Sequence, residues 1–303
     1  MVPLTIWQFN AGPDTWVNTI AGGEGTQIMG AMGKVRAAGI FSYNLGLTFF
    51  YGASFAIALA NEALRDFLPK ILTRLLLAAA ILTGILSASR TSVLSLALII
   101  VGFCSLILIN TRLSARGLSG FAIVIVCLLM PLSFTGLFRE GQEVLITRFT
   151  DAAEAEAVPN GIASLSFLNR LQDSLVEPFD VLPETPLLGR GLGLGTNAGS
   201  QLSTGAPDFL LAENEWPRVV MEAGPIVGFG YMLLRVVFTV WLVVLSLRAA
   251  MSGNALPFLL WCACAYNFVF GQWGPPATLG LAMFVAGLCL TSMSFTPIEP
   301  RLS

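Results

Sequence analysis

The chain has 303 residues, of which 55% are hydrophobic and 11% are charged, and its formal net charge at pH 7 is -2. Soluble domains carry about 25% charged residues, so this composition excludes an ordinary soluble protein, and the lack of basic runs excludes a nucleic-acid-binding protein. The chain contains no histidine, which removes the usual general base and the usual metal ligand.

Apolar runs of about 20 residues predict seven membrane-spanning helices. We expect them at residues 41–60, 67–87, 91–109, 118–137, 224–247, 255–273 and 277–295. The expected fold is therefore all-α and polytopic, with one large external loop of short helices. Its successive parts are an external N-terminal segment (1–40), four spans (41–137), the large loop (138–223), three spans (224–295) and a cytoplasmic tail (296–303).

Basic residues orient these spans. When the spans alternate across the membrane, most of the flanking basic residues fall on one side: Arg65, Lys70, Arg74, Arg112, Arg116, Arg248 and Arg301. The positive-inside rule makes that side cytoplasmic, and the large loop, in which acidic residues outnumber arginines, is then external. Residues 1–40 lie outside as well, although they show no signal peptide. Either this segment is translocated without help, or the chain begins partway through a longer protein. We expect the second, with an odd number of helices missing upstream.

Two arginines lie near the external ends of predicted spans. Arg36 precedes the first span in the segment KVRAAGIFSYN, and Arg90 lies in the turn SASRTS between the second and third spans. The N-terminus of a helix attracts anions, and an arginine beside it can hold a phosphate with two hydrogen bonds. The alternative for Arg90 is a side chain that extends to the outer lipid head groups.

The large loop contains a glycine-rich segment, PLLGRGLGLGTNAG, at residues 186–199. Its glycines, Gly189, Gly191 and Gly193 among them, allow positive φ angles and a close approach of the backbone to a ligand. Consecutive N–H groups in such a segment can form an anion-binding nest, and Arg190 lies among them. The alternative is a flexible turn.

The loop closes with ENEWPRVVMEAG at residues 213–224. Glu213, Asn214 and Glu215 stand directly before a predicted helix, where they can cap the helix and complement its dipole. A carboxylate at this position can also act as a general base or orient a hydroxyl group. Further along, Arg235 falls near the middle of the fifth predicted span, where a charge is costly and faces the protein interior or a polar cavity. Two interpretations are open: Arg235 pairs with a carboxylate or a lipid phosphate inside the bundle, or the fifth span is displaced and Arg235 lies closer to an interface.

Four segments resemble, in order, parts of the O-antigen ligase and O-antigen polymerase family of bacterial envelope enzymes. They are RAAGIFSYNLGLTFF (36–50), SASRTSVLSLAL (87–98), SLSFLNRLQDSLVEPFDVLPETPLLGRGLGLG (164–195) and ENEWPRVVMEAGPIVGFGY (213–231). The resemblance implies a multi-pass inner-membrane enzyme of GT-C type with a large periplasmic loop. It implies transfer of a glycan from undecaprenyl pyrophosphate to an acceptor, without a metal, nucleotide sugar or other cofactor. A flippase or a chain-length regulator of the same pathway is an expected partner.

One departure from the family favours a polymerase over a ligase. Ligases that attach O-antigen to lipid A–core generally carry a histidine in the large loop, often before an asparagine, and here Glu213 precedes Asn214. We expect Arg36, Arg90 and Arg190 to stabilise the departing pyrophosphate, and Glu213 or Glu215 to orient or deprotonate the acceptor hydroxyl. The expected substrate-binding residues are Gly189, Gly191, Gly193, Asn214, Arg170 and Arg218. A ligase of the same fold and, less well supported, a transporter remain the alternatives.

Overall fold

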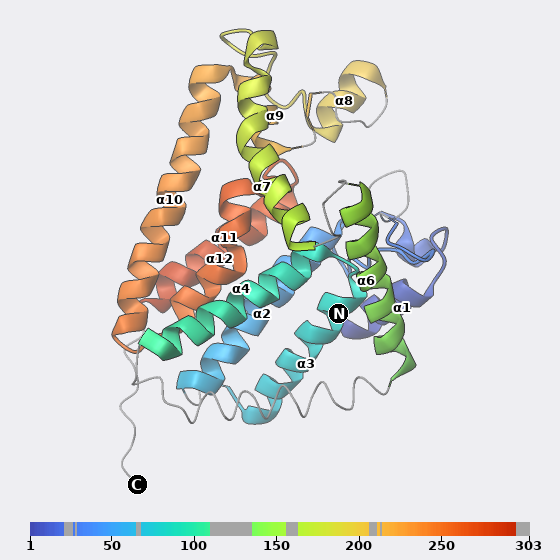
Figure 1. Ribbon diagram of the computed structural model, residues 1–303, viewed down its shortest axis with the longest axis vertical. Coiled ribbons are helices and arrows are strands. Elements are labelled where there is room, and N and C mark those ends of the chain that lie inside the picture. The colour runs from blue at the N-terminus through green and yellow to red at the C-terminus, as the bar shows by residue number, and fades with distance from the viewer. Residues whose placement is uncertain are drawn as a thin grey trace. The chain divides into compact units, whose positions relative to one another are not determined.

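The computed structural model of the chain describes residues 1–20, 27, 29–64, 68–109, 135–155, 163–205, 211–212 and 214–294 (Figure 1). Within these ranges the α-helices are α1 (Val2–Asn10), α2 (Asn44–Leu64), α3 (Lys70–Leu86), α4 (Arg90–Ile109), α6 (Gly136–Ala155), α7 (Ala163–Asp180), α8 (Asn197–Thr204), α9 (Glu215–Ala223), α10 (Pro225–Met251), α11 (Leu256–Phe270) and α12 (Pro276–Ser292). Short 3-10 helices cover Trp16–Asn18 and Leu182–Glu184. The described residues form no β-strand, and the prediction of an all-α fold is confirmed for them.

Six of the seven predicted spans coincide with helices, to within a few residues at each end. Two of these helices, α4 and α10, are long and apolar enough to cross a membrane, whereas α11 and α12 are apolar but have 15 and 17 residues. The predicted span at 118–137 lies largely outside the described residues, apart from the start of α6. The helical pattern therefore agrees with the prediction, and the passage of all seven runs through a membrane stays a prediction.

The chain divides into two compact units. The first consists of Met1–Asp151, Leu242–Cys264 and Gly280–Ser303, and the second consists of Ala152–Trp241 and Ala265–Leu279. Three helices, α10, α11 and α12, contribute residues to both. The predicted division into N-terminal segment, spans and large loop follows other boundaries and stays a prediction.

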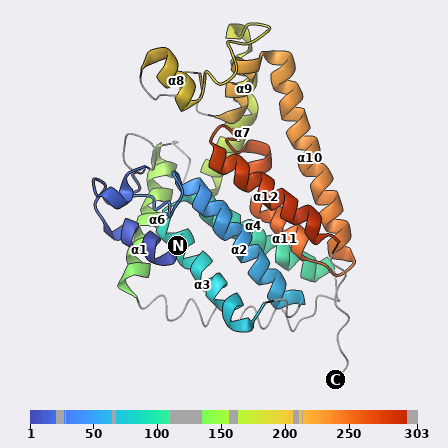
Figure 2. The same cartoon turned by 180° about the vertical axis from the view of Figure 1, so that it is seen from behind.

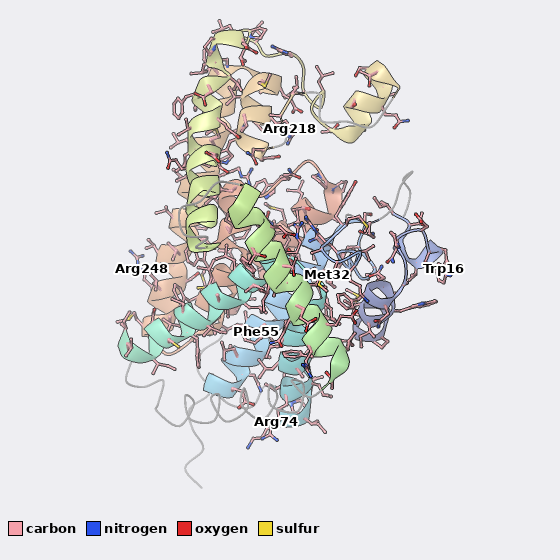
Figure 3. All side chains as sticks on the ribbon, turned by 45° about the vertical axis from the view of Figure 1, so that its right-hand side comes forward. Trp16, Met32, Phe55, Arg74, Arg218 and Arg248 are labelled. Carbon is pink, nitrogen blue, oxygen red and sulfur yellow. The ribbon has the colours of Figure 1, made fainter. Side chains whose placement is uncertain are left out.

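In the first unit, α2 packs against α3 and α4 (Figure 2). Hydroxyl groups join these helices, since Thr48 Oγ1 lies 2.6 Å from Ser92 Oγ, and Ser87 donates a 3.0 Å hydrogen bond to Ser92. Phe55 of α2 is fully buried, whereas Trp16 and Arg74 project outward (Figure 3). The hydroxyl groups of Thr48, Ser87 and Ser92 therefore satisfy one another between the helices, which avoids the cost of burying them without a partner.

The N-terminal segment is ordered around α1. The buried Gln8 side chain donates hydrogen bonds to the carbonyl groups of Val17 and Gly39, at 3.1 and 3.0 Å, and accepts one from the Gly39 N–H at 2.7 Å. Next to it, Phe9 packs in a cluster with Val144 of α6 and with Leu86 at the end of α3. The Gln8 side chain thus connects three parts of the N-terminal segment: α1, the residues around Val17 and the residues around Gly39.

In the second unit, α9 and α10 form an antiparallel hairpin around Gly224. Val220 lies against Gly228, and the Glu215 carboxylate faces the Arg235 guanidinium. α7 packs on α9, and Phe179 of α7 lies with its ring 5.2 Å from that of Phe229 in α10. The end of the predicted external loop therefore runs alongside the first turns of an apolar helix.

We expect Gln8→Ala to loosen the N-terminal segment. The substitution removes three hydrogen bonds and leaves the buried Gly39 N–H without its acceptor, a loss of about 1–3 kcal/mol for an unsatisfied buried group. Faster cleavage between residues 10 and 40 in limited proteolysis would show it. Gln142→Ala, at an exposed position of α6, is the control. Equal cleavage of the two variants would contradict this role of Gln8.

Candidate functional site

Helix α9 carries three charged side chains that are nearly fully buried. They are spaced as Glu215, Arg218 and Glu222, so that the arginine stands three residues after one carboxylate and four before the other. At this spacing the side chains share one face of a helix. The face is covered within the unit, and α9 ends at Gly224, whose φ of 82° is unfavourable for other residues.

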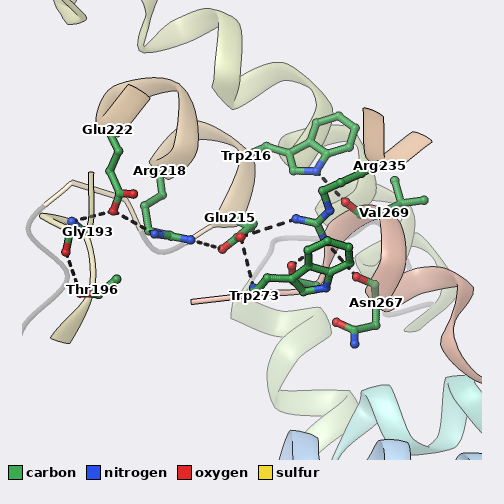
Figure 4. Close-up of polar contacts among 12 residues, drawn as sticks. Gly193, Thr196, Glu215, Trp216, Arg218, Glu222, Arg235, Asn267, Val269 and Trp273 are labelled. Atoms are coloured by element: carbon green, nitrogen blue, oxygen red, sulfur yellow. Dashed lines mark hydrogen bonds and ion pairs between the residues drawn. The ribbon is translucent and has the colours of Figure 1, made fainter. Parts of the chain in front are cut away.

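These charges form a continuous chain of contacts (Figure 4). Arg218 donates a 2.6 Å hydrogen bond to Glu215 Oε2 and a 2.8 Å hydrogen bond to Glu222 Oε1. Glu222 Oε1 also accepts a 2.9 Å hydrogen bond from the Gly195 N–H. Burial alone would lower the pKa of Arg218, but the carboxylates of Glu215 and Glu222 outweigh it and raise the pKa above its ordinary value. Arg218 is thus a permanent cation that is held by two carboxylates.

The chain continues through Glu215 to Arg235 of α10. Glu215 Oε1 lies 3.5 Å from Arg235 Nη1 and accepts a 3.2 Å hydrogen bond from the Trp273 N–H. Arg235 is 1% exposed, and its Cζ lies 4.0 Å from the centre of the Trp273 ring. Two buried arginines and two buried carboxylates therefore balance one another, as buried charges require.

Arg235 also caps the C-terminal end of α11. Its Nε donates to the carbonyl of Phe268 at 2.8 Å, and its Nη2 donates to the carbonyls of Asn267 at 3.0 Å and Gly271 at 2.8 Å. The last carbonyls of a helix lack partners within the helix and carry its negative end. The two pairings expected for Arg235 were a carboxylate and a lipid phosphate, and the structure places a carboxylate beside it.

The glycine-rich segment is docked on the C-terminal end of α9. The N–H groups of Arg190 and Gly191 donate to the carbonyls of Met221 and Glu222, at 2.8 and 3.1 Å. Gly189 has a φ of 72°, and a Cβ on it would collide with the carbonyl of Glu222. Glycine is therefore required at position 189 for the backbone conformation and for the close approach.

These contacts occupy the backbone N–H groups at the start of the glycine loop. The N–H groups of Gly189, Arg190 and Gly191 all donate to carbonyls of the protein, that of Gly189 to Pro186 at 2.8 Å. An anion nest built from these three groups is not supported, because their hydrogen bonds hold the loop on α9. Gly191 and Gly193 do adopt the positive φ angles that the sequence predicts, at 122° and 85°.

The Arg190 side chain lies on the surface of this docked loop. It is exposed, and its Nη2 donates a 3.0 Å hydrogen bond to the carbonyl of Glu184. A guanidinium has five N–H donors, so Arg190 retains the capacity to bind an anion from outside. Among the predicted cations of the second unit, Arg190 is exposed and Arg218 is enclosed.

Glu215 does not have the environment of an accessible general base. It is 3% exposed, and its two oxygens face two arginines and a backbone amide. This enclosed position does not favour the prediction that Glu215 orients or deprotonates a hydroxyl group, which stays a prediction. Asn214 donates a 2.6 Å hydrogen bond to Glu177 and so joins α9 to α7. Glu213 and the side chain of Arg170 lie outside the described residues.

Arg36 and Arg90 belong to the first unit. Arg90 is the first residue of α4, at a helix N-terminus as predicted. Both side chains are half-buried and interact with the protein. Their predicted contact with a pyrophosphate stays a prediction.

Several residues in this chain of buried charges and their contacts were not predicted as site residues. The spacing of Glu215, Arg218 and Glu222 is visible in the sequence and could have identified Glu222. Gly195 belongs to the predicted glycine-rich segment, whereas Trp273 reaches Glu215 from a distant segment and no local pattern marks it. In the part of the chain that the structure describes, no three His, Cys, Asp or Glu side chains are placed to hold a metal ion.

Comparison with protein-family models, curated proteins and solved structures found no match to this chain. The resemblance to O-antigen ligases and polymerases is therefore carried by the quoted segments alone.

We expect Arg218→Met to destabilise the second unit strongly. It leaves two buried carboxylates without their shared cation, and breaking a buried charge pair in this way costs about 3–5 kcal/mol. Arg190→Met is the control, because surface substitutions usually stay within about 0.5 kcal/mol. The measurement is the thermal unfolding midpoint in detergent. A midpoint for Arg218→Met equal to that of the control would mean that the charge chain contributes little to stability.

Comparison of Gly189→Ala with Gly193→Ala separates two effects of the added Cβ. One is the collision with the backbone of α9, and the other is the strain of a positive φ angle. Both positions have positive φ, which costs about 1–2 kcal/mol for alanine. A Cβ at position 193 meets nothing within 4 Å, whereas at position 189 it collides with the backbone of α9. We expect the larger loss of unfolding free energy at 189, with faster proteolysis of the loop. Similar losses at the two positions would argue against tight docking.

Proposed function

We propose that this chain is a polytopic inner-membrane glycosyltransferase that polymerises oligosaccharide repeat units linked to undecaprenyl pyrophosphate. The observation that carries the proposal is the exposed Arg190, on a loop that is hydrogen-bonded to α9 directly beside the start of the long apolar helix α10. A fixed cation at the end of such a helix suits a lipid-linked anion. The four ordered segments that resemble the family support the same reaction.

The reaction needs an acceptor, a leaving group and a route for one proton. An acceptor sugar hydroxyl attacks the anomeric carbon of the donor glycan and forms a new glycosidic C–O bond. The bond from that carbon to the pyrophosphate breaks, and its electron pair leaves with undecaprenyl pyrophosphate. The hydroxyl proton passes to a carboxylate, for which Glu213 is the candidate now that Glu215 is enclosed by arginines.

In this proposal Arg190 stabilises the pyrophosphate as negative charge develops on it. Arginine suits this role because its planar donors match phosphate oxygens in pairs. Arg218 supports it indirectly, since its carboxylate partner Glu222 holds the Gly195 N–H and thereby the far end of the loop. Such support keeps a binding group in position, which lowers the cost of ordering it on binding.

The transporter alternative depended on the charge of Arg235 within a predicted span. In the structure Arg235 is bound by Glu215 and by three carbonyls at the end of α11. These contacts give Arg235 a structural role and remove the specific support for transport. The ligase alternative shares the chemistry above and differs in the acceptor.

The test is the polysaccharide ladder in a strain that makes the cognate repeat unit and lacks its own polymerase. We expect Arg190→Ala to lose most of the long chains and Arg190→Lys to keep part of them, because lysine retains the charge without the paired donors. Arg248→Ala, at the opposite end of α10, is the matched control and should give a normal ladder. All variants are compared at equal membrane abundance.

Three results would change the proposal. Normal ladders from Arg190→Ala would remove that residue from the leaving-group role. Glycan found on lipid A–core or on protein, with no lengthening of lipid-linked chains, would identify a ligase. Movement of the lipid-linked glycan across liposome membranes without any transfer would identify a transporter.

A further inference from the structure

Three exposed leucines flank Arg190 along the chain of the glycine loop. Leu187, Leu188 and Leu192 are 69%, 88% and 83% exposed. Single exposed leucines are ordinary on protein surfaces, but a cluster of large apolar side chains marks a contact with a partner or a membrane.

Their place in the fold points to the end of α10. The carbonyl of Leu187 lies directly against Gly224, where any Cβ would collide with it, and Gly224 immediately precedes Pro225, the first residue of α10. The Arg190 N–H is bonded to Met221, within the last turn of α9. The leucines therefore lie level with the first turn of α10.

The outer face of α10 is apolar over nearly its whole length. Its exposed side chains form one stripe that includes Ile226, Leu233, Val237, Val244 and Leu247. From Ile226 to Leu247 this stripe measures about 32 Å at 1.5 Å per residue, close to the roughly 30 Å hydrocarbon core of a bilayer. The exposed Arg248 follows at the far end, as expected for a cytoplasmic anchor. A bilayer that covers the stripe has its outer boundary at the first turn of α10.

Helix α7 extends the same apolar surface. Leu175, Val176 and Phe179 are exposed on it, and the Phe179 ring lies 5.2 Å from that of Phe229 in α10. Apolar side chains at i, i+1 and i+4 form one face of a helix. This face therefore lies beside the upper part of α10.

We propose that the leucines of the glycine loop and the apolar face of α7 are immersed in the outer leaflet of the lipid bilayer. The inference rests on the proposed function in one respect, namely that α10 crosses the membrane. It adds that the loop contacts lipid and does not extend into the aqueous phase. Arg190, flanked by Leu188 and Leu192, is then held at the depth of lipid phosphate groups, where a lipid-linked pyrophosphate lies.

Photo-crosslinking to lipid tests this placement. Benzoylphenylalanine replaces one residue at a time at Leu188, at Val237 in the middle of the α10 stripe, and at Leu202 of α8. Leu202 is the matched control, because it is a leucine of the same unit, is 90% exposed and lies on α8, which the two views place away from α10 (Figures 1 and 2). The full chain is reconstituted in vesicles of phosphatidylethanolamine and phosphatidylglycerol that contain a trace of alkyne-tagged phosphatidylcholine.

We expect crosslinks to the tagged lipid at Leu188 and Val237 on the order of tenfold above those at Leu202, because a side chain in water meets few acyl chains. Crosslinking at Val237 with Leu188 no higher than Leu202 would overturn the inference and leave the proposed membrane helix intact. Lack of lipid crosslinks at Val237 would overturn both. A crosslink from Leu188 to another protein in native membranes, in place of lipid, would show that a protein partner covers the leucines.

Discussion

The second unit depends on a chain of buried charges that joins three helices and a loop. It runs from the carbonyls at the end of α11 through Arg235, Glu215, Arg218 and Glu222 to the Gly195 N–H. Each charge has been removed from water, and the cost is offset only because each meets an opposite charge or a backbone group. The positions of α9, α10, α11 and the glycine loop are therefore linked to one another. None of these elements can move far without leaving a buried charge exposed to an apolar environment.

This constraint separates the supporting residues of the site from those that can act on a ligand. Glu215, Arg218 and Glu222 are engaged with one another and with the protein, so they support the loop. Arg190 lies on the outside of the same loop with most of its donors available to an external anion. The buried, charge-balanced residues hold the loop that carries the exposed Arg190, which supports the proposed binding of a pyrophosphate leaving group, because a positioned group needs little ordering on binding.

Glycine has two different functions in this part of the chain. At Gly189 and Gly224 the backbones of the loop and of the hairpin touch, so no side chain fits. At Gly191 and Gly193 the positive φ angles are the requirement, and the surrounding space is open. The first pair holds the loop at the start of α10, and the second pair shapes its exposed surface. Together they explain why the segment is rich in glycine without a role for its N–H groups at 189–191 in anion binding.

The apolar runs by themselves located six of the helices, because the hydrophobicity of about 20 consecutive residues is a local property that does not depend on tertiary contacts. They also located the polar segment that contains Arg190 and the Glu215–Glu222 pattern. The roles of individual charged residues depended on tertiary structure. Glu215 resembles an available carboxylate in the sequence, and in the structure it is enclosed because Arg235 and Trp273, 20 and 58 residues away, are folded against it. Such contacts are set by the packing of distant helices, and no local pattern encodes them.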